Sequence, residues 1–223
     1  MSIDVTDILR ATDLLGSASA ADLEAVAAAS RERTFRRGQI LFSAGDPGGT
    51  VIVIVSGRVQ VVVRSGDGGE LTLTVLGPGG VLGDISAVDG GPRSADAETL
   101  EDCRLLFVPR EVIQDLSGRV PSVALALASS VAAAMRRLTE DTSDLVFLDL
   151  PRRVAKALLS QPRGDDGVIG QKMTQEQLAH RVGGTRQSVN GALRGFERRG
   201  WIEVRDRAVT VKQVAALSRF AGS

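Results

Sequence analysis

Residues 33 to 108 hold short runs of β-branched side chains that Gly, Asp and Pro interrupt at regular intervals. Runs of this length are typical of strands rather than helices. The tetrapeptide Gly66-Asp67-Gly68-Gly69 separates VQVVV from LTLTV and predicts a hairpin. Many short strands at such spacing favour a compact β-barrel or roll. We therefore expect a β-roll that ends near Val108.

Helical periodicity flanks this β region on both sides. Residues 4–30 predict two short helices, and Pro109 is suited to open a further helix at its first turn. Residues 120–150 predict a long helix, which Pro151 ends because the residue before proline disfavours the α region. Its apolar stripe consists of Val123, Leu127, Val131, Met135, Leu138, Leu145 and Leu148. The stripe favours pairing with a second copy, although the helix could instead pack only on its own β-roll.

The stretch TQEQLAHRVGGTRQSVNGALRGFERRG, which begins at Thr174, predicts two helices joined by a glycine turn. Thr174 and Gln177 have the spacing of a capping box. Gly183-Gly184 would supply the positive φ of a tight turn. The inward positions of the two helices are Leu178, Ala179, Val182, Val189, Leu193 and Phe196. This is the pattern of a helix-turn-helix.

Polar residues cluster at the start of the second of these helices. Thr185, Arg186, Gln187 and Asn190 have no core duty there, and such side chains hydrogen-bond phosphates and base edges in the major groove. Gln175, at the start of the first helix, is a further candidate. The following WIEVRDRAVTV alternates as two strands around a charged tip, which predicts a wing. Together these features predict binding to double-stranded DNA.

The charge distribution supports the same interpretation. Residues 152–223 carry 14 Lys and Arg against 6 Asp and Glu, whereas residues 1–151 carry 13 against 21. A basic C-terminal third beside an acidic remainder indicates two modules, the basic one suited to a polyanion. The single Cys103, the acidic N-terminus and the lack of a long apolar run favour a cytoplasmic protein without a membrane segment.

Catalytic and metal-binding patterns are missing from the sequence. No nucleophile–base pair, metal cluster or P-loop is present, so we do not expect an enzyme or a metal site. His180 is the only histidine and lacks Cys or Asp at ligand spacing, which predicts a surface or partly buried residue.

Over nearly its whole length the chain resembles the CRP/FNR transcription regulators. The resemblance is carried by FSAGDPGG, VSGRVQV, LGDISAVDGGPRSA, LVFLDLPRRVAKALL and TQEQLAHRVGGTRQSVNGALRGFERRGWI. It implies an α+β fold with a cyclic-nucleotide-binding-like β-roll over residues 1–119, a long dimerisation helix over 120–150 and a winged helix-turn-helix over 151–223. It also implies a homodimer that binds a two-fold symmetric operator and contacts RNA polymerase.

Within this resemblance, GDISAVDGGPRSA matches the phosphate-binding cassette of the family. The resemblance implies that Arg93 pairs with the cyclic phosphate, that Ser94 donates a hydrogen bond, and that Gly83 with the following backbone at Ile85 allows close approach. Asp84 stands where cyclic-AMP binders have a glutamate that holds the ribose 2′-hydroxyl. An alternative is that Arg93 only caps a loop or pairs with Asp84 or Asp89.

Four departures from the family pattern bear on specificity. Asp84 is one methylene shorter than glutamate, and the adenine-contacting Thr-Ser pair of the long helix falls at Leu138-Thr139. Cyclic AMP is therefore the leading effector, with another nucleotide or none as alternatives. Gln187 replaces a glutamate and Gly191 a basic residue, so the operator should differ from the usual half-site, with adenine favoured at Gln187.

Two further possibilities concern cofactors and partners. No cofactor is expected, since the N-terminal cysteine cluster of iron–sulfur members is missing and Cys103 is the only candidate haem ligand in the β-roll. A second class of function is a cyclic-nucleotide-binding module that regulates a protein partner, but such modules lack a winged C-terminal domain.

Overall fold

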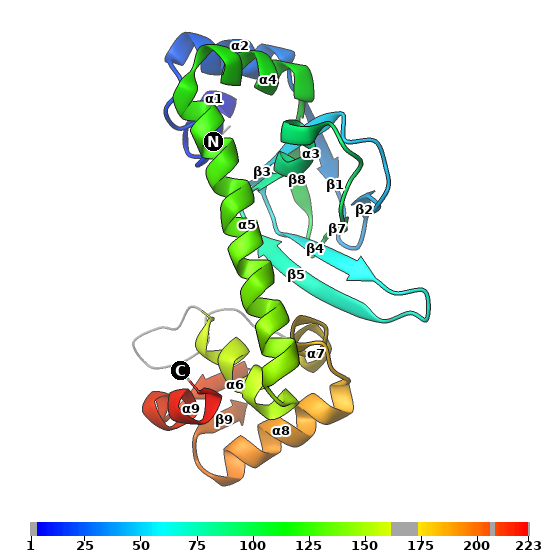
Figure 1. Ribbon diagram of the computed structural model, residues 1–223, viewed down its shortest axis with the longest axis vertical. Helices are drawn as coiled ribbons and strands as arrows, with labels where there is room; N and C mark the ends of the chain where they lie inside the picture. The colour runs from blue at the N-terminus through cyan, green and yellow to red at the C-terminus, as the bar shows by residue number, and fades with distance from the viewer. Residues whose placement is uncertain (1–3, 162–173, 206–207, 223) are drawn as a thin grey trace. The chain divides into compact units, whose positions relative to one another are not determined.

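Figure 1 shows a computed structural model of the chain, which describes residues 4–161, 174–205 and 208–222. The chain divides into two compact units. The first unit comprises Met1–Arg64 and Leu73–Arg137, and the second comprises Ser65–Thr72 and Leu138–Ser223. The predicted loop at 162–170 and the tip of the predicted wing at 206–207 lie outside the described residues.

Two antiparallel sheets form the body of the first unit. The strands of these sheets are β1 (Arg31–Phe35), β2 (Ile40–Phe42), β3 (Thr50–Ser56), β4 (Val59–Arg64), β5 (Glu70–Leu76), β6 (Val81–Leu82), β7 (Asp96–Thr99) and β8 (Cys103–Pro109). Residues 70–72 of β5 belong to the second unit. The strand orders are β1-β8-β3-β6 and β2-β7-β4-β5. A buried cluster that includes Ile52, Val59 and Leu105 takes side chains from both sheets. The predicted β-roll and the hairpin between VQVVV and LTLTV are confirmed.

Helices cover the other side of the strands at the centre of the first sheet. They are α1 (Val5–Arg10), α2 (Ala20–Ala29), α3 (Asp84–Asp89), α4 (Arg110–Arg119) and the start of α5 (Pro121–Phe147). Alternate residues of β3 and β8, such as Val53 and Leu106, pack against side chains of these helices. Burial on both faces explains why β3 reads as an unbroken apolar run rather than an alternating one.

The long helix α5 differs from its prediction in two respects. It ends at Phe147, and Asp149 caps the next helix, α6 (Leu150–Leu159), by accepting a hydrogen bond from the Arg152 backbone. The prediction that Pro151 ends the long helix is therefore wrong: Pro151 lies in the first turn of α6, where a missing N–H costs nothing. By length and composition, none of the described helices could cross a membrane singly. Only α4 and α5 together, bent by 120°, meet that test.

The apolar stripe of α5 is buried near the start of the helix and exposed farther along it. Val123 and Leu127 are buried in the core of the first unit. By contrast, Met135 and Leu138 are 71% and 58% exposed. The alternative that the helix packs on its own β-roll thus holds for its first turns only.

The second unit contains the predicted helix-turn-helix and wing. Its elements are α6, α7 (Gln175–Val182), α8 (Arg186–Arg198), β9 (Ile202–Arg205), β10 (Ala208–Val211) and α9 (Val214–Ala221). β9 and β10 pair in antiparallel register, which confirms the wing. The sequence interpretation missed α9, whose Phe220 ring lies 5.5 Å from the ring of buried Phe196. These helices and the hairpin enclose one buried cluster.

Candidate effector site and DNA-binding face

Gly83 occupies a position that only glycine can fill. It follows β6, has φ +84°, and directly precedes α3. A Cβ atom at this position would lie 2.1 Å from Nη1 of Arg93 and 2.9 Å from the carbonyl oxygen of Thr50. The backbone at Gly83 therefore lies directly against the Arg93 side chain, which is the close approach that the sequence predicted.

The Arg93 side chain is 5% exposed and only partly satisfied. Its Nη2 donates to the carbonyl oxygen and the hydroxyl of Thr50, at 2.7 and 3.0 Å. Its guanidinium carbon lies 4.3 Å from the centre of the Phe42 ring. Among the described residues, Nε and Nη1 are buried without a hydrogen-bond partner. Buried donors without a partner are rare because each costs free energy.

The charge of Arg93 is also poorly compensated. Burial lowers the pKa of Arg93 from its ordinary value, and the negative charge of Asp46 acts in the opposite direction. The alternative that Arg93 pairs with Asp84 or Asp89 is wrong. Asp84 bonds elsewhere, and Asp89 accepts from the backbone of Gly91. A buried guanidinium with two donors that lack partners within the described residues has the chemistry to bind an anion.

Both carboxylate oxygens of Asp84 are engaged in the first unit. Oδ1 accepts from the backbone N–H of Ile85 at 3.0 Å. Oδ2 accepts from the hydroxyl of Ser130, on α5. Ser130 was not among the predicted site residues: its spacing from Val123 and Leu127 places it on the inward face of α5, but the sequence does not show that this face meets Asp84.

The contacts of the remaining predicted effector residues in the described part of the chain do not assign them a role. Ser94 is exposed directly after Arg93, and Ile85 is half-buried. Leu138 and Thr139 belong to the second unit, so their part in an effector site stays a prediction.

The two helices of the helix-turn-helix are capped by the residues that the sequence indicated. The Thr174 hydroxyl accepts from the Gln177 backbone, and the Gln177 side chain accepts from the Thr174 backbone, so the capping box is confirmed. Thr185 caps α8 by accepting from the backbone of Ser188 at 3.2 Å. All six predicted inward residues are buried: Leu178, Ala179, Val182, Val189, Leu193 and Phe196.

The two glycines of the turn have separate roles. Gly183 has φ +62° and ends α7, as predicted. Gly184 has an ordinary φ, but a Cβ on it would lie 2.5 Å from Cδ1 of Leu150 on α6. Gly183 thus supplies the positive φ that was predicted for the Gly183-Gly184 pair, and Gly184 lets the turn approach α6.

The outward face of α8 is polar and rich in arginine. Arg186 and Gln187 are exposed in its first turn, and Asn190 is half-exposed one turn later. Arg194 and Arg198 continue the exposed face. Within the described parts of the chain, Arg186, Arg194 and Arg198 form no ion pair. We call Thr185, Arg186, Gln187, Asn190 and Arg194 the α8 face.

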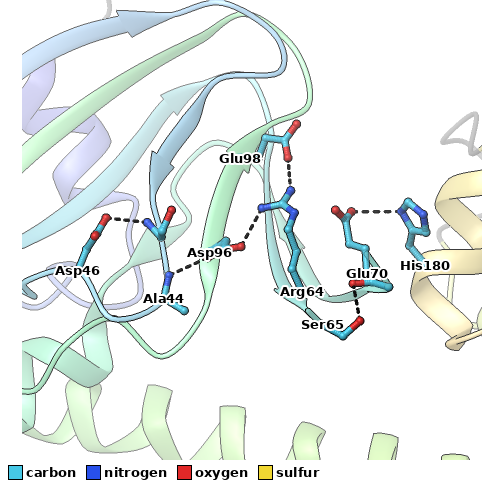
Figure 2. A network of polar contacts seen from close by, with 10 residues as sticks. Ala44, Asp46, Arg64, Ser65, Glu70, Asp96, Glu98 and His180 are labelled. Carbon is cyan, nitrogen blue, oxygen red and sulfur yellow. Dashed lines mark hydrogen bonds and ion pairs between the residues drawn. The ribbon is translucent and has the colours of Figure 1, made fainter. Parts of the chain in front are cut away.

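Two further residues considered in the sequence lie on α7. Gln175 is half-exposed at the first turn of α7. His180, partly buried on α7, has Nδ1 3.1 Å from Oε1 of Glu70 (Figure 2). Among the described residues, no group of three or more His, Cys, Asp or Glu side chains could hold a metal ion.

Comparison with known protein families identifies one domain in each half of the chain. Residues 32–119 match the model of the cyclic nucleotide-binding domain, and residues 152–220 match that of the Crp-like helix-turn-helix domain. These two domains in this order define a DNA-binding transcription regulator.

Relatives match along most of the chain. A CRP-like cAMP-activated global transcriptional regulator of Mycobacterium tuberculosis is 34% identical over 193 residues, which cover 84% of this chain and 86% of the relative. The cyclic AMP receptor protein of Thermus thermophilus is 33% identical over 191 residues, covering 86% and 88%. The chain belongs to the CRP/FNR family of transcription regulators.

A solved structure supports the fold. The c-di-GMP responsive regulator CLP of Xanthomonas campestris matches with a TM-score of 0.75 at 24% identity, covering 86% of this chain and 99% of that one. The confirmed family and fold agree with the predicted order of β-roll, long helix and winged helix-turn-helix.

Proposed function

We propose that this regulator binds a cyclic nucleotide beside Arg93 and, as a cytoplasmic homodimer, binds a two-fold symmetric operator in response. The observation that carries the proposal is the buried Arg93 guanidinium with two unpartnered nitrogen atoms. A cyclic phosphate carries one negative charge and acceptor oxygens, so it would supply both the counter-charge and the missing partners. Charge-assisted bonds of this kind are the strong ones.

Cyclic AMP is the leading effector. The relatives from M. tuberculosis and T. thermophilus are named for cyclic AMP, and Gly83, Asp84 and Arg93 stand at the cassette positions of this chain. Asp84 is shorter than the usual glutamate, and Leu138 has no hydroxyl for the base. The alternative is another nucleotide, as the c-di-GMP responsive CLP illustrates for a protein of the same fold.

The α8 face provides the contacts for DNA in this proposal. Arg186 has the fork geometry for the O6 and N7 atoms of guanine, and Gln187 and Asn190 suit the N6 and N7 atoms of adenine. Thr185, Gln175 and Arg194 would contact the phosphates on either side. The protein would regulate transcription together with RNA polymerase and would not act as an enzyme.

Dimerisation is proposed through the exposed part of α5. Met135 and Leu138 lie three residues apart, which places them on one face of the helix, and both are exposed. A second copy of the same helix would cover this apolar face with two-fold symmetry.

Calorimetric titration tests the effector proposal. Cyclic AMP, cyclic GMP and c-di-GMP are titrated into wild type, Arg93→Leu and Arg58→Leu, the last being a control that removes a surface arginine paired with Glu101. We expect Arg93→Leu to weaken binding by about tenfold or more, because a charge-assisted bond is worth roughly 1.5–3 kcal/mol. Absence of heat with all three ligands would show that the regulator works without them.

Selection from random-sequence DNA, with and without the bound nucleotide, tests the DNA proposal. We expect an enriched two-fold symmetric sequence, with tighter binding in the presence of the nucleotide. Enrichment that is independent of nucleotide would leave the DNA-binding function standing and refute its control by the effector.

A further inference from the structure

Each carboxylate oxygen of Asp84 already accepts one hydrogen bond inside the protein before any ligand is considered. Oδ1 is taken by the Ile85 backbone, and Oδ2 by the Ser130 hydroxyl. Asp84 therefore differs from Arg93, two of whose nitrogen atoms lack partners. A ligand that bonds both residues fills unused donors on Arg93 but meets an occupied acceptor on Asp84.

The position of Ser130 on α5 is determined by the core of the first unit. Val123 and Leu127 are buried in that core, and Ser130 follows at the spacing that keeps it on the same face of the helix. Ser130 is half-buried, whereas Ser129 is exposed. The helix thus presents one hydroxyl, from Ser130, to the carboxylate at the start of α3.

We propose that Ser130 is an internal competitor for Asp84, and that a ribose 2′-hydroxyl displaces it from Oδ2 when the effector binds. The inference rests on the proposed function, since it assumes a nucleotide beside Arg93. The chemistry is an exchange of like for like: one hydroxyl donor on Oδ2 replaces another. The nucleotide's hydroxyl therefore contributes less net affinity than it would at a carboxylate with a free acceptor.

This competition links the effector to α5 by thermodynamic necessity. A ligand that takes Asp84 releases Ser130, and a change that removes the Ser130 hydroxyl must favour the ligand by the same free energy. Ser130 thus lowers the affinity for any nucleotide that has a 2′-hydroxyl. For a nucleotide without that hydroxyl, the Asp84–Ser130 bond can persist and Ser130 is neutral.

The test compares two ligands and two serine variants by calorimetric titration of the full chain. The ligands are cyclic AMP and 2′-deoxy cyclic AMP, and the variants are Ser130→Ala and its exposed neighbour control Ser129→Ala. We expect Ser130→Ala to tighten cyclic AMP about threefold to tenfold, the range of a net hydrogen bond. Its affinity for the 2′-deoxy ligand should stay at the wild-type value, and Ser129→Ala should match wild type with both ligands.

Each other outcome has a definite meaning. Weaker or unchanged cyclic AMP binding by Ser130→Ala would overturn the competition, and so would an equal change for both ligands, while the effector proposal would stand. If wild type binds neither ligand but binds cyclic GMP or c-di-GMP, the same comparison is made between that ligand and its 2′-deoxy form, and the same results support or overturn the competition. If wild type binds none of these nucleotides, the proposed function fails and the competition with it.

Discussion

Replacing Arg93 by Met should leave the nucleotide-free protein almost as stable as wild type, although it removes a buried charged side chain. The two unpartnered donors, Nε and Nη1, each cost about 1–3 kcal/mol, and the substitution recovers that cost. It loses the bonds from Nη2 to Thr50, about 2 kcal/mol, and the contact with Phe42, about 1 kcal/mol. An unpaired Thr50 carbonyl adds about 1 kcal/mol of loss.

The gains, about 2–6 kcal/mol, and the losses, about 4 kcal/mol, cancel to within about 2 kcal/mol, whereas breaking a fully paired buried ion pair costs about 3–5 kcal/mol. Nucleotide binding, by contrast, should make wild type clearly more stable than the variant. At a concentration one hundred times Kd, wild type should gain about 2.7 kcal/mol and the variant nothing. Differential scanning calorimetry with and without cyclic AMP measures both differences, with Arg58→Met as a variant that should keep the nucleotide response.

Two results would refute this reasoning. A loss of about 3 kcal/mol or more in the nucleotide-free Arg93→Met protein would mean that Arg93 has strong partners in solution. A nucleotide response of wild-type size in Arg93→Met would mean that the anion binds elsewhere.

Three further predictions address the DNA, the dimer and pH. Arg186→Ala should weaken binding to the selected operator by about 1–3 kcal/mol more than binding to random DNA, as measured by gel shift. An equal loss on both would indicate a phosphate contact. The double substitution Met135→Glu and Leu138→Glu should give monomers in analytical ultracentrifugation, because it places charges on the exposed apolar face of α5. A dimer that persists would place the interface elsewhere. Asp96→Asn should destabilise the protein at neutral pH, since the hydrogen bond from the Ala44 backbone, and then Arg64, lower the pKa of Asp96 below its ordinary 3.8 (Figure 2). That contribution is present above pH 3.8 and lost as the pH falls through the lower folded value, so denaturation curves of the two proteins should converge in acid. A difference that persists unchanged below pH 2 would refute the role of the charge.

The burial of Leu127 changes how the dimer should be tested. The stripe of α5 suggested that any of its apolar residues faces a second copy, but Leu127 lies in the core of its own unit. A charge there would unfold the β-roll before it reported on association. The helical period shows that a stripe exists, whereas tertiary packing decides what each turn of it contacts.

The features that were predicted correctly from the sequence are those that depend on residues close together in the chain. The capping box joins Thr174 to Gln177, and the cap of α8 joins Thr185 to Ser188. The start of each helix can therefore be predicted from residues three positions apart. Gly183 ends a helix for the same local reason.

Contacts between distant residues were not visible in the same way. Thr50 lies 43 residues before Arg93, and Ser130 lies 46 after Asp84, so periodicity indicates neither partner. The sequence placed an arginine and an aspartate in one cassette. Only the fold shows that, among the described residues, Nε and Nη1 of the arginine lack partners, whereas each carboxylate oxygen of the aspartate has one.

The strand order of the first unit has a consequence for the time course of folding. Its central strand β8 pairs with β3 and β1, so Val51 meets Val108 and Arg31 meets Phe107. No such pair can form on the ribosome until the chain beyond β8 has emerged, and closing these long loops is slow. The second unit, by contrast, consists mainly of helices, whose hydrogen bonds are local, and its strands β9 and β10 are neighbours in sequence. After dilution from denaturant, the C-terminal half should therefore acquire its structure in a faster kinetic phase than the β-roll, although the ribosome delivers it last.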